Sequence, residues 1–228
     1  MQSDLNDKVV VVTGASRGIG RATAQLFLEQ GARVVMFART KMNAPERALA
    51  IAGDASSERD VDRLFAQCES KFGPCDILVN CPGMIDPGEL VKTTVDRWDQ
   101  MFAVNVRSIF LACRRALPKM IERGRGAIVN VASISGVIGP EKFPGFVSYC
   151  ASKGAVISLT EALAVEVKGK GVRVNCVSPG SVDTKMWAEA SGGAPADMTP
   201  EEIAKTILFL ATDASRPMNG QNLHVYSA

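Results

Sequence analysis

Residues 8–20 read KVVVVTGASRGIG, so four consecutive valines lead directly into a turn that contains Gly14, Gly18 and Gly20. A short β-branched run is typical of a buried strand, and the residues from Gly18 onward have the apolar spacing of a helix. The free N–H groups of a helix N-terminus attract anions, and glycine lets a pyrophosphate approach that backbone closely. The segment therefore predicts a dinucleotide-binding turn, against the simpler interpretation of a merely tight turn.

The rest of the chain alternates short apolar strands with longer amphipathic helices, which is typical of β-α-β units around a parallel sheet. We expect strands at 9–12, 33–37, 48–52, 77–80, 127–131, 173–177 and 223–226, and helices near 18–30, 58–71, 94–123, 147–168 and 200–212. The segment between the second and third strands is too short for a crossover helix and contains Pro45, so we expect a turn or loop there. The predicted fold class is α/β: a Rossmann-type, doubly wound parallel sheet of about seven strands with helices on both faces.

Composition narrows the classes of partner. The 228 residues fit one domain, 1–228, and the net charge of +2 leaves no basic stripe for nucleic acid. No apolar run reaches the roughly 18 residues that a membrane span needs, so we expect no membrane partner and a cytoplasmic location. The six cysteines form no CxxC pair and are expected to be reduced thiols. A single histidine, His224, argues against a Ser-His-Asp triad and against a multi-histidine metal site, and we expect no metal.

The stretch SYCASK at 148–153 places Tyr149 four residues before Lys153, so on a helix both side chains point from one face. A tyrosine loses its proton near pH ~10, and an adjacent ammonium stabilises the phenolate, so we expect a lowered pKa for Tyr149. The pair would protonate a carbonyl oxygen in reduction and remove an alcohol proton in oxidation. Taken alone, this spacing is more often structural, but the upstream glycine turn favours the catalytic interpretation.

Two further polar residues are candidates for the same site. Ser133 follows the fifth strand at the carboxyl edge of the sheet, where its hydroxyl can hydrogen-bond a substrate oxygen and orient it. Ser135 is a nearby alternative. Asn105 falls within the apolar stripe of the 94–123 helix, so its amide needs buried partners, and a locally satisfied amide is the alternative to a role in the site.

Together, these motifs resemble the short-chain dehydrogenase/reductase family, including its 3-oxoacyl reductase-like members, along the whole chain. TGASRGIG matches the family's cofactor turn, NCPG at 80–83 stands where the family usually has NNAG, and SPG at 178–180 matches the segment after the sixth strand. The four catalytic positions of the family fall on Asn105, Ser133, Tyr149 and Lys153. In the family, the asparagine supports a bound water that gives the lysine a proton path to solvent, and the lysine also binds the nicotinamide ribose.

The resemblance also implies a set of contacts to a nicotinamide dinucleotide. These contacts fall on Gly14, Ser16, Arg17, Gly18, Ile19, Gly20, Arg39, Asp54, Ala55, Asn80, Gly83, Tyr149, Lys153, Pro179, Gly180, Val182 and Thr184. Thr184 would hydrogen-bond the carboxamide or a phosphate, and Asp54 the adenine amino group. The rival interpretation of Asp54 is a simple cap for the helix that follows it.

The end of the second strand predicts the choice of cofactor. An acidic residue there would accept from the adenosine ribose hydroxyls and repel a 2′-phosphate, but this strand ends with Ala38 and Arg39. Arg39 could grip a phosphate, and Arg17 could add a second cation. NADP(H) is therefore favoured and NAD(H) is possible; the alternative interpretation of Arg39 is a solvated surface charge.

The sequence thus predicts an NADPH-dependent oxidoreductase that reversibly reduces a ketone or 3-oxo substrate to a secondary alcohol, with a small carbonyl or alcohol molecule as its partner. We expect a short, mobile substrate loop around 185–200. The resemblance implies a homodimer or homotetramer, although the terminal HVYSA departs from the family's usual VDGG and weakens the tetramer. The alternative functions are a non-catalytic NADP(H)-binding sensor or structural protein, and an NAD-dependent alcohol dehydrogenase.

Overall fold

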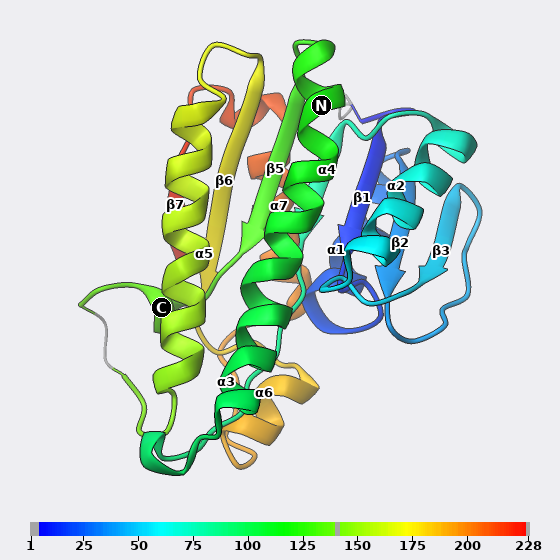
Figure 1. Ribbon diagram of the computed structural model, residues 1–228. Coiled ribbons are helices and arrows are strands. Elements are labelled where there is room, and N and C mark those ends of the chain that lie inside the picture. The colour runs from blue at the N-terminus through cyan, green and yellow to red at the C-terminus, as the bar shows by residue number, and fades with distance from the viewer. Residues whose placement is uncertain (1–4, 140–141, 227–228) are drawn as a thin grey trace.

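The computed structural model describes residues 5–139 and 142–226, so the last two residues of HVYSA and two residues of the 134–146 loop lie outside the described part. The described residues form one seven-stranded sheet in the order β3-β2-β1-β4-β5-β6-β7 (Figure 1). Every neighbouring pair of strands is parallel. The strands are β1 Val9–Thr13, β2 Arg33–Ala38, β3 Ala48–Ala52, β4 Ile77–Asn80, β5 Gly126–Val131, β6 Val172–Pro179 and β7 Asn222–Val225. The predicted α/β, Rossmann-type fold is confirmed.

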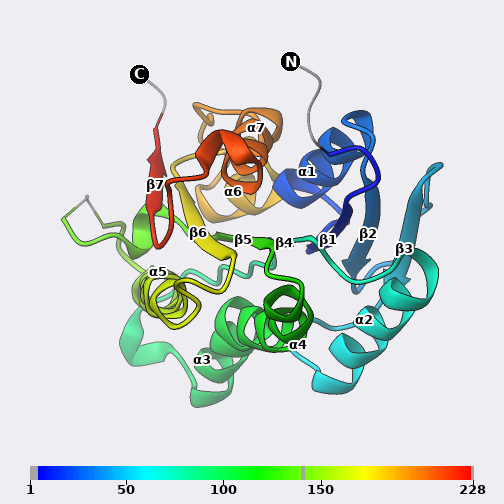
Figure 2. The same cartoon turned by 90° about the horizontal axis from the view of Figure 1, so that it is seen from above.

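Helices cover both faces of this sheet (Figure 2). They are α1 Gly18–Glu29, α2 Glu58–Phe72, α3 Val95–Phe102, α4 Ser108–Glu122, α5 Val147–Glu166, α6 Lys185–Ala190 and α7 Pro200–Ala211. One apolar core joins the sheet to α2, α4 and α5, and a second joins it to α1 and α7. Because both faces are covered, central strands such as β1 are buried along their whole length, which explains the unbroken run of valines.

A chain of buried polar side chains crosses the sheet near its carboxyl edge. The Thr13 hydroxyl donates to Asn80 Oδ1 at 3.3 Å, and Asn80 Nδ2 donates to Asn130 Oδ1 at 2.9 Å. Asn130 Nδ2 then donates to the Thr160 hydroxyl of α5 at 2.9 Å. All four residues are buried, and each amide finds a partner, as burial requires. This polar chain, Thr13–Asn80–Asn130–Thr160, links β1, β4, β5 and α5.

The helix expected over 94–123 is present as α3, a π-helical turn and α4, which follow one another without a break; the π-helical turn within it was not predicted. Thr94 caps α3 by accepting from the Arg97 N–H at 3.3 Å, and a π-helical turn, Ala103–Arg107, separates α3 from α4. The π turn carries Asn105, whose side chain bonds the backbone of Met84 in the loop after β4. Insertions of this kind are frequent at functional sites, and apolar periodicity alone does not reveal them.

The link between β2 and β3 and the short helix α6 are the other two segments for which sequence and structure can be compared. The link between β2 and β3 contains no helix, as predicted. The short helix α6 was not predicted, because six residues are too few to show a clear period. Its start carries a readable signal, since the Thr184 hydroxyl accepts from the Trp187 N–H at 3.2 Å. Within 5–139 and 142–226, no helix has the length and apolar character needed to cross a membrane.

Candidate active site

The carboxyl ends of the central strands open into a cleft of ≈ 1240 Å³. The strand order reverses between β1 and β4, and open α/β sheets bind ligands at such a reversal. A pocket for one small ligand usually measures roughly 300–1,000 Å³. The cleft is therefore large enough for a dinucleotide together with a second molecule.

The glycine turn has the geometry of a phosphate cradle. Gly14 has a φ of 71°, and a Cβ at this position would lie 2.3 Å from the carbonyl oxygen of Cys81. Helix α1 begins at Gly18 with no side-chain cap from Arg17 and no acidic residue in its first turn. No carboxylate or capping side chain therefore occupies the first N–H groups of α1, and these groups face the cleft, where they can bind an anion. The turn fits the pyrophosphate of a dinucleotide.

Two arginines line the end of the cleft where the sequence predicts the adenosine half of a cofactor, called the adenosine end below. Arg17 and Arg39 both line it, and within the described chain neither forms an ion pair or a side-chain hydrogen bond. Asp54 lines the same end, and its Oδ1 accepts from the Ser56 N–H and hydroxyl, both at 2.8 Å. Ser57, not Asp54, caps α2, so the interpretation of Asp54 as the helix cap is wrong.

Ser133, Tyr149 and Lys153 meet at the other end of the cleft, as predicted from their spacing. Lys153 is 3% exposed, and its ammonium donates to the carbonyl oxygen of Val131 at 2.9 Å. It lies 5.8 Å from the centroid of the Tyr149 ring. The Ser133 hydroxyl is close enough to the phenolic group of Tyr149 to favour its ionised form and so to lower its pKa. A hydroxyl, a phenol and an ammonium therefore surround one place where a substrate oxygen could sit.

The electrostatics of the pair differ from the sequence-based expectation. Burial raises the pKa of Tyr149 to about 12, while the nearby Ser133 hydroxyl opposes that rise. Burial also lowers the pKa of Lys153 to about 8. The expected lowering of the Tyr149 pKa by the neighbouring ammonium is therefore wrong for the protein alone, because the loss of solvation is the larger effect. At neutral pH, Tyr149 is therefore a neutral phenol, and Lys153 carries an ammonium that loses its proton more readily than an ordinary lysine does.

The backbone of Gly136 holds Ser133 against α5. Gly136 ends a 3₁₀ turn, Ile134–Gly136, that follows Ser133, and a Cβ on Gly136 would lie 2.4 Å from the carbonyl carbon of Lys153. Only a residue without a side chain allows this approach. The turn and the helix thus pack with their backbones in contact, which fixes the hydroxyl relative to Tyr149.

Two predicted site residues do not line the cleft. Asn105 is fully buried: its Oδ1 accepts from the Met84 N–H at 2.7 Å, and its Nδ2 donates to the Met84 carbonyl and the Ser152 hydroxyl, both at 2.9 Å. The amide thus ties the loop after β4 to α5 next to Lys153. Asn80 is also fully buried, and its side chain belongs to the polar chain beneath the glycine turn; its contact with a cofactor stays a prediction.

The other predicted residues lie together in the wall of the cleft. They are Gly14, Ser16, Arg17, Gly18, Ile19, Gly20, Arg39, Asp54, Ala55, Gly83, Ser133, Tyr149, Lys153, Pro179, Gly180, Val182 and Thr184. The Thr184 methyl group stands opposite Gly18, 3.1 Å from where a Cβ would be. The segment after β6 therefore faces the glycine turn across the cleft.

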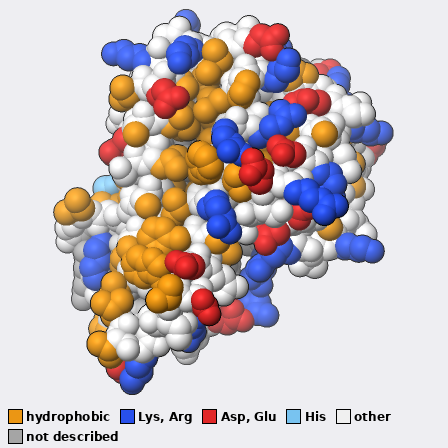
Figure 3. Space-filling model, in the orientation of Figure 1, with side chains coloured by type: hydrophobic (Ala, Val, Ile, Leu, Met, Phe, Trp, Pro, Cys, Tyr) orange, Lys and Arg blue, Asp and Glu red, His pale blue; other side chains and the backbone are white. Residues whose placement is uncertain are grey.

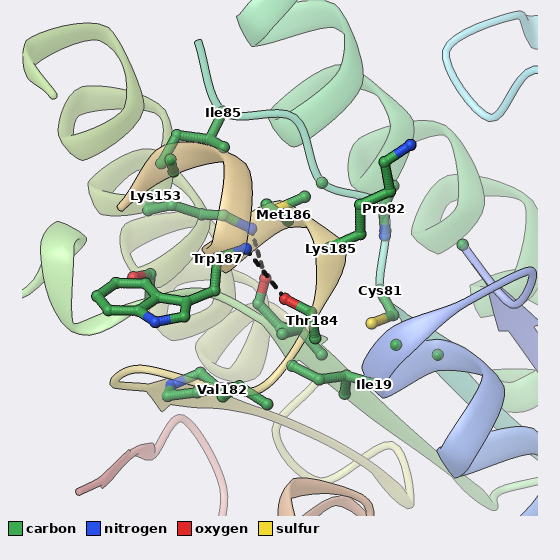
Figure 4. A pocket seen from close by; sticks show the side chains of 18 of the residues that line it. Ile19, Cys81, Pro82, Ile85, Lys153, Val182, Thr184, Lys185, Met186 and Trp187 are labelled. Atoms are coloured by element: carbon green, nitrogen blue, oxygen red, sulfur yellow. Dashed lines mark hydrogen bonds between the residues drawn. The ribbon is translucent and has the colours of Figure 1, made fainter. Parts of the chain in front are cut away.

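Six other apolar residues also line the cleft, and the sequence indicated only two of them, Phe143 and Phe146, through the loop at 137–146 that it predicts to contribute to the substrate pocket. These six are Ile85, Phe143, Phe146, Met186, Trp187 and Tyr226. Figure 4 shows Trp187 and Ile85 on the side of Lys153, with Ile19 of the glycine turn and Cys81, which follows β4, on the other side. The six apolar residues come from four separate segments of the chain. Aromatic side chains outside the main helices and strands were the only sequence signal that could have pointed to them.

Residues 181–198 form a flap that is fastened at its base. The Ser181 hydroxyl donates to Asp197 Oδ2 at 2.5 Å and accepts from the Asp197 N–H at 3.0 Å. Val182 and Met198 form an isolated parallel bridge. Inside the flap, the Trp187 indole N–H donates to the carbonyls of Ala194 and Pro195, at 3.0 and 3.2 Å. The substrate loop expected around 185–200 corresponds to this flap; its mobility stays a prediction.

Comparison with known proteins agrees with this architecture. A family model described as short chain dehydrogenase matches residues 8–194. The chain therefore belongs to the short-chain dehydrogenase family and is an oxidoreductase of that family, as the motifs predicted.

Its relatives carry different substrates in their names. It is 38% identical to a 2-(R)-hydroxypropyl-CoM dehydrogenase of Xanthobacter autotrophicus, over 95% of this chain and 96% of the relative. A solved aldohexose dehydrogenase of Thermoplasma acidophilum superposes with a TM-score of 0.90 at 29% identity, covering 98% of this chain and 94% of the other. A 3-ketoacyl-(acyl-carrier-protein) reductase of Brucella melitensis, solved with NADH, gives 0.89 at 32% identity, covering 97% and 98%.

Proposed function

We propose that the chain is an NADPH-dependent reductase that converts a ketone or 3-oxo substrate into a secondary alcohol, and that can run in reverse. The observation that carries the proposal is the convergence of Ser133, Tyr149 and Lys153 at one end of a cleft whose other end is the glycine turn. The cofactor supplies the hydride when it is bound; the protein must hold the substrate and deliver a proton.

The residues divide that work by their chemistry. The hydroxyl of Ser133 orients the substrate oxygen toward Tyr149, whose proton is strongly retained because burial raises its pKa to about 12. Tyr149 donates this proton to the oxygen as negative charge develops there, and the Lys153 ammonium, close to the ring, stabilises the phenolate left behind. We propose that Asn105 holds Lys153 in position through its bonds to Met84 and Ser152. We also propose that Asn105 supports a bound water that links Lys153 to solvent and so resupplies its proton.

Two observations support NADPH over NADH. Strand β2 ends at Ala38 without an acid that would repel a 2′-phosphate, and the unpaired guanidinium groups of Arg17 and Arg39 stand at that end of the cleft. The Brucella neighbour was solved with NADH, so NAD(H) remains the alternative that the cofactor assay must compare.

The function is tested by NADPH oxidation with a panel of ketones, acyl thioesters, quinones and keto sugars. Tyr149→Phe is expected to lower kcat by about 10²- to 10⁴-fold and to leave NADPH binding intact. Cys150→Ala is the matched control, because Cys150 is the next residue of α5 and does not line the cleft. Tight NADPH binding without turnover on any substrate would instead support a non-catalytic sensor.

We further propose that the protein works as a homodimer or homotetramer in the cytoplasm. A strip of hydrophobic side chains runs over α4 and α5 on the face shown in Figure 3. Phe110 and Val165 on these helices are 45% and 74% exposed. Contiguous exposed apolar surface of this kind is typical of an interface between subunits. The six cysteines are unpaired thiols, which favours a reducing compartment.

A further inference from the structure

The end of the cleft beside Tyr149 is built from apolar side chains. The Phe146 ring is 9% exposed and meets the Tyr149 ring edge-on, with centroids 6.1 Å apart. Phe143 continues this row outward, 5.7 Å from Phe146, and is 47% exposed at the mouth. A row of rings thus leads from solvent to the phenol. Substrate atoms beyond the carbonyl would lie against this row.

Trp187 of α6 supplies another part of this wall. Its only polar atom, the indole N–H, is already occupied by the carbonyls of Ala194 and Pro195. The indole therefore offers the cleft a π surface and no hydrogen-bond donor. Ile85 and Met186 line the same end of the cleft (Figure 4).

Charged groups are arranged away from this wall. Within the described chain, the charged residues that line the cleft are Arg17, Arg39, Asp54, Lys153, Lys185 and Asp197. The first three stand at the adenosine end, and Lys153 belongs to the reacting centre. Lys185 lies on the side of Pro82 in Figure 4, opposite Trp187, with its side chain 67% exposed. Asp197 is engaged by Ser181.

We infer that the substrate is an uncharged ketone whose larger substituent is apolar, either aromatic or a medium-length alkyl chain, and that Phe146 and Trp187 select it. This inference rests on the proposed reductase function and specifies its substrate class. A substrate with a charged tail would have to bury that charge against rings that cannot pair with it, which is costly. A polyhydroxylated substrate would leave without partners those hydroxyls that lie against the rings of Phe146 and Trp187.

The test is a series of 2-alkanones from 2-butanone to 2-octanone, assayed with NADPH. An apolar wall predicts that kcat/KM rises roughly three- to fourfold with each added methylene until the wall is filled. The matched charged substrate is 7-oxooctanoate, a methyl ketone of the same chain length, and its kcat/KM is expected to be at least about tenfold below that of 2-octanone. A flat series, or a preference for 7-oxooctanoate, overturns the inference.

Variants identify the residue responsible. Trp187→Ala is expected to lower kcat/KM for 2-octanone by about tenfold while changing that for 2-butanone less than about threefold. Because this change also removes the bonds to Ala194 and Pro195, Trp187→Phe serves as a second variant and should retain the chain-length dependence. Glu189→Ala is the matched control on the same helix, because Glu189 does not line the cleft, and it should leave both ketones unaffected. A 7-oxooctanoate preference that disappears in Lys185→Ala would show an anion site instead.

Binding without turnover separates this inference from the proposed function. The chain has two tryptophans, and Trp98 stacks on Phe102 in α3 without lining the cleft. In Trp98→Phe protein with NADP⁺, 2-octanone should change the Trp187 fluorescence at lower concentration than 7-oxooctanoate does. The same result without any reduction by NADPH would refute the reductase and retain the apolar site. If 7-oxooctanoate changes the fluorescence at the same or a lower concentration than 2-octanone does, the apolar site is refuted, whether or not the protein reduces either ketone.

Discussion

Lys153 stands one turn after Tyr149 on α5, but its ammonium donates to the Val131 carbonyl of β5 at 2.9 Å and lies 5.8 Å from the phenol ring. The lysine is therefore fastened to the sheet, and its charge acts on the phenol across a short gap. Both side chains lose solvent in this arrangement, which shifts the two pKa values in opposite directions. Tyr149 therefore keeps its proton to a higher pH than an ordinary tyrosine, and Lys153 loses its proton at a lower pH than an ordinary lysine. This difference has two measurable effects.

The first effect is a pH limit on reduction. The Lys153 pKa is lowered to about 8, so the ammonium is present below that pH and is lost above it, while Tyr149 stays protonated because its pKa is about 12. We expect kcat/KM for ketone reduction to be level below pH 8 and to fall as the pH rises through about 8. A profile that stays level to pH 10 in folded protein would contradict this assignment; circular dichroism at each pH is the control.

The second effect is on stability. The unfolded chain binds the Lys153 proton up to about pH 10.5, the ordinary value, whereas the folded chain releases it near 8. Between these values the unfolded state binds more protons, so the folded state gains stability as the pH rises. The free energy of unfolding of the wild type should therefore increase relative to Lys153→Met between pH 8 and 10.5, by up to about 3 kcal/mol. Urea titrations of both proteins measure the difference; a constant difference would show that the lysine titrates normally.

Gly136→Ala should damage both stability and turnover. The new methyl group would meet the Lys153 backbone at 2.4 Å, and backbone atoms of a helix cannot move aside as a flexible side chain can. We expect a loss of about 1–3 kcal/mol in the free energy of unfolding and a fall in kcat as Ser133 shifts from Tyr149. Gly88→Ala is the control, because a Cβ at Gly88 meets nothing within 4 Å. Equal effects of the two changes would refute the packing argument.

Arg39→Asp tests the cofactor preference. The carboxylate would repel the 2′-phosphate and could accept from ribose hydroxyls, so KM for NADPH should rise by roughly tenfold or more while KM for NADH stays level or falls. Lys41→Asp makes the same charge change two residues away, outside the cleft lining, and should affect neither cofactor strongly. If Arg39→Asp weakens NADPH and NADH equally, Arg39 does not read the phosphate.

Phe110→Glu tests the proposed oligomer. The phenyl ring is exposed on α4 with the Arg114 guanidinium above it, 5.1 Å from the ring centroid. A carboxylate at this position would place charge in an apolar interface, so light scattering should show a smaller assembly than the wild type. Val91→Glu changes a more exposed residue away from α4 and α5 and should leave the mass unchanged. A wild type that is already monomeric would refute the proposal directly.

The sequence predicted those parts of the site that depend on local spacing. The glycine turn and the Tyr149–Lys153 pair are each defined within a few residues, so the backbone geometry of a strand, a turn and a helix is enough to place them. The strands were predictable for a similar reason, since burial on both faces leaves a continuous apolar run.

Other parts depend on contacts between distant segments. Val131, the partner of the Lys153 ammonium, is 22 residues away in the sequence, and no spacing rule connects the two. The rise in the Tyr149 pKa comes from burial, which is a property of the packed fold. The π turn carries Asn105, whose amide bonds the backbone of Met84, 21 residues away. The apolar wall likewise combines Phe146 at the start of α5 with Trp187 of α6.

The polar chain Thr13–Asn80–Asn130–Thr160 gives the architecture a further property. It connects the strand that precedes the glycine turn to the helix that carries Tyr149 and Lys153. The glycine turn and the Tyr149–Lys153 pair are therefore parts of one cross-linked frame, whereas Phe143 lies outside it on the loop before α5 and Trp187 lies outside it on α6. Substitutions at these two positions can change which substrate the proposed reductase accepts without disturbing the frame, so specificity and reaction geometry can evolve separately.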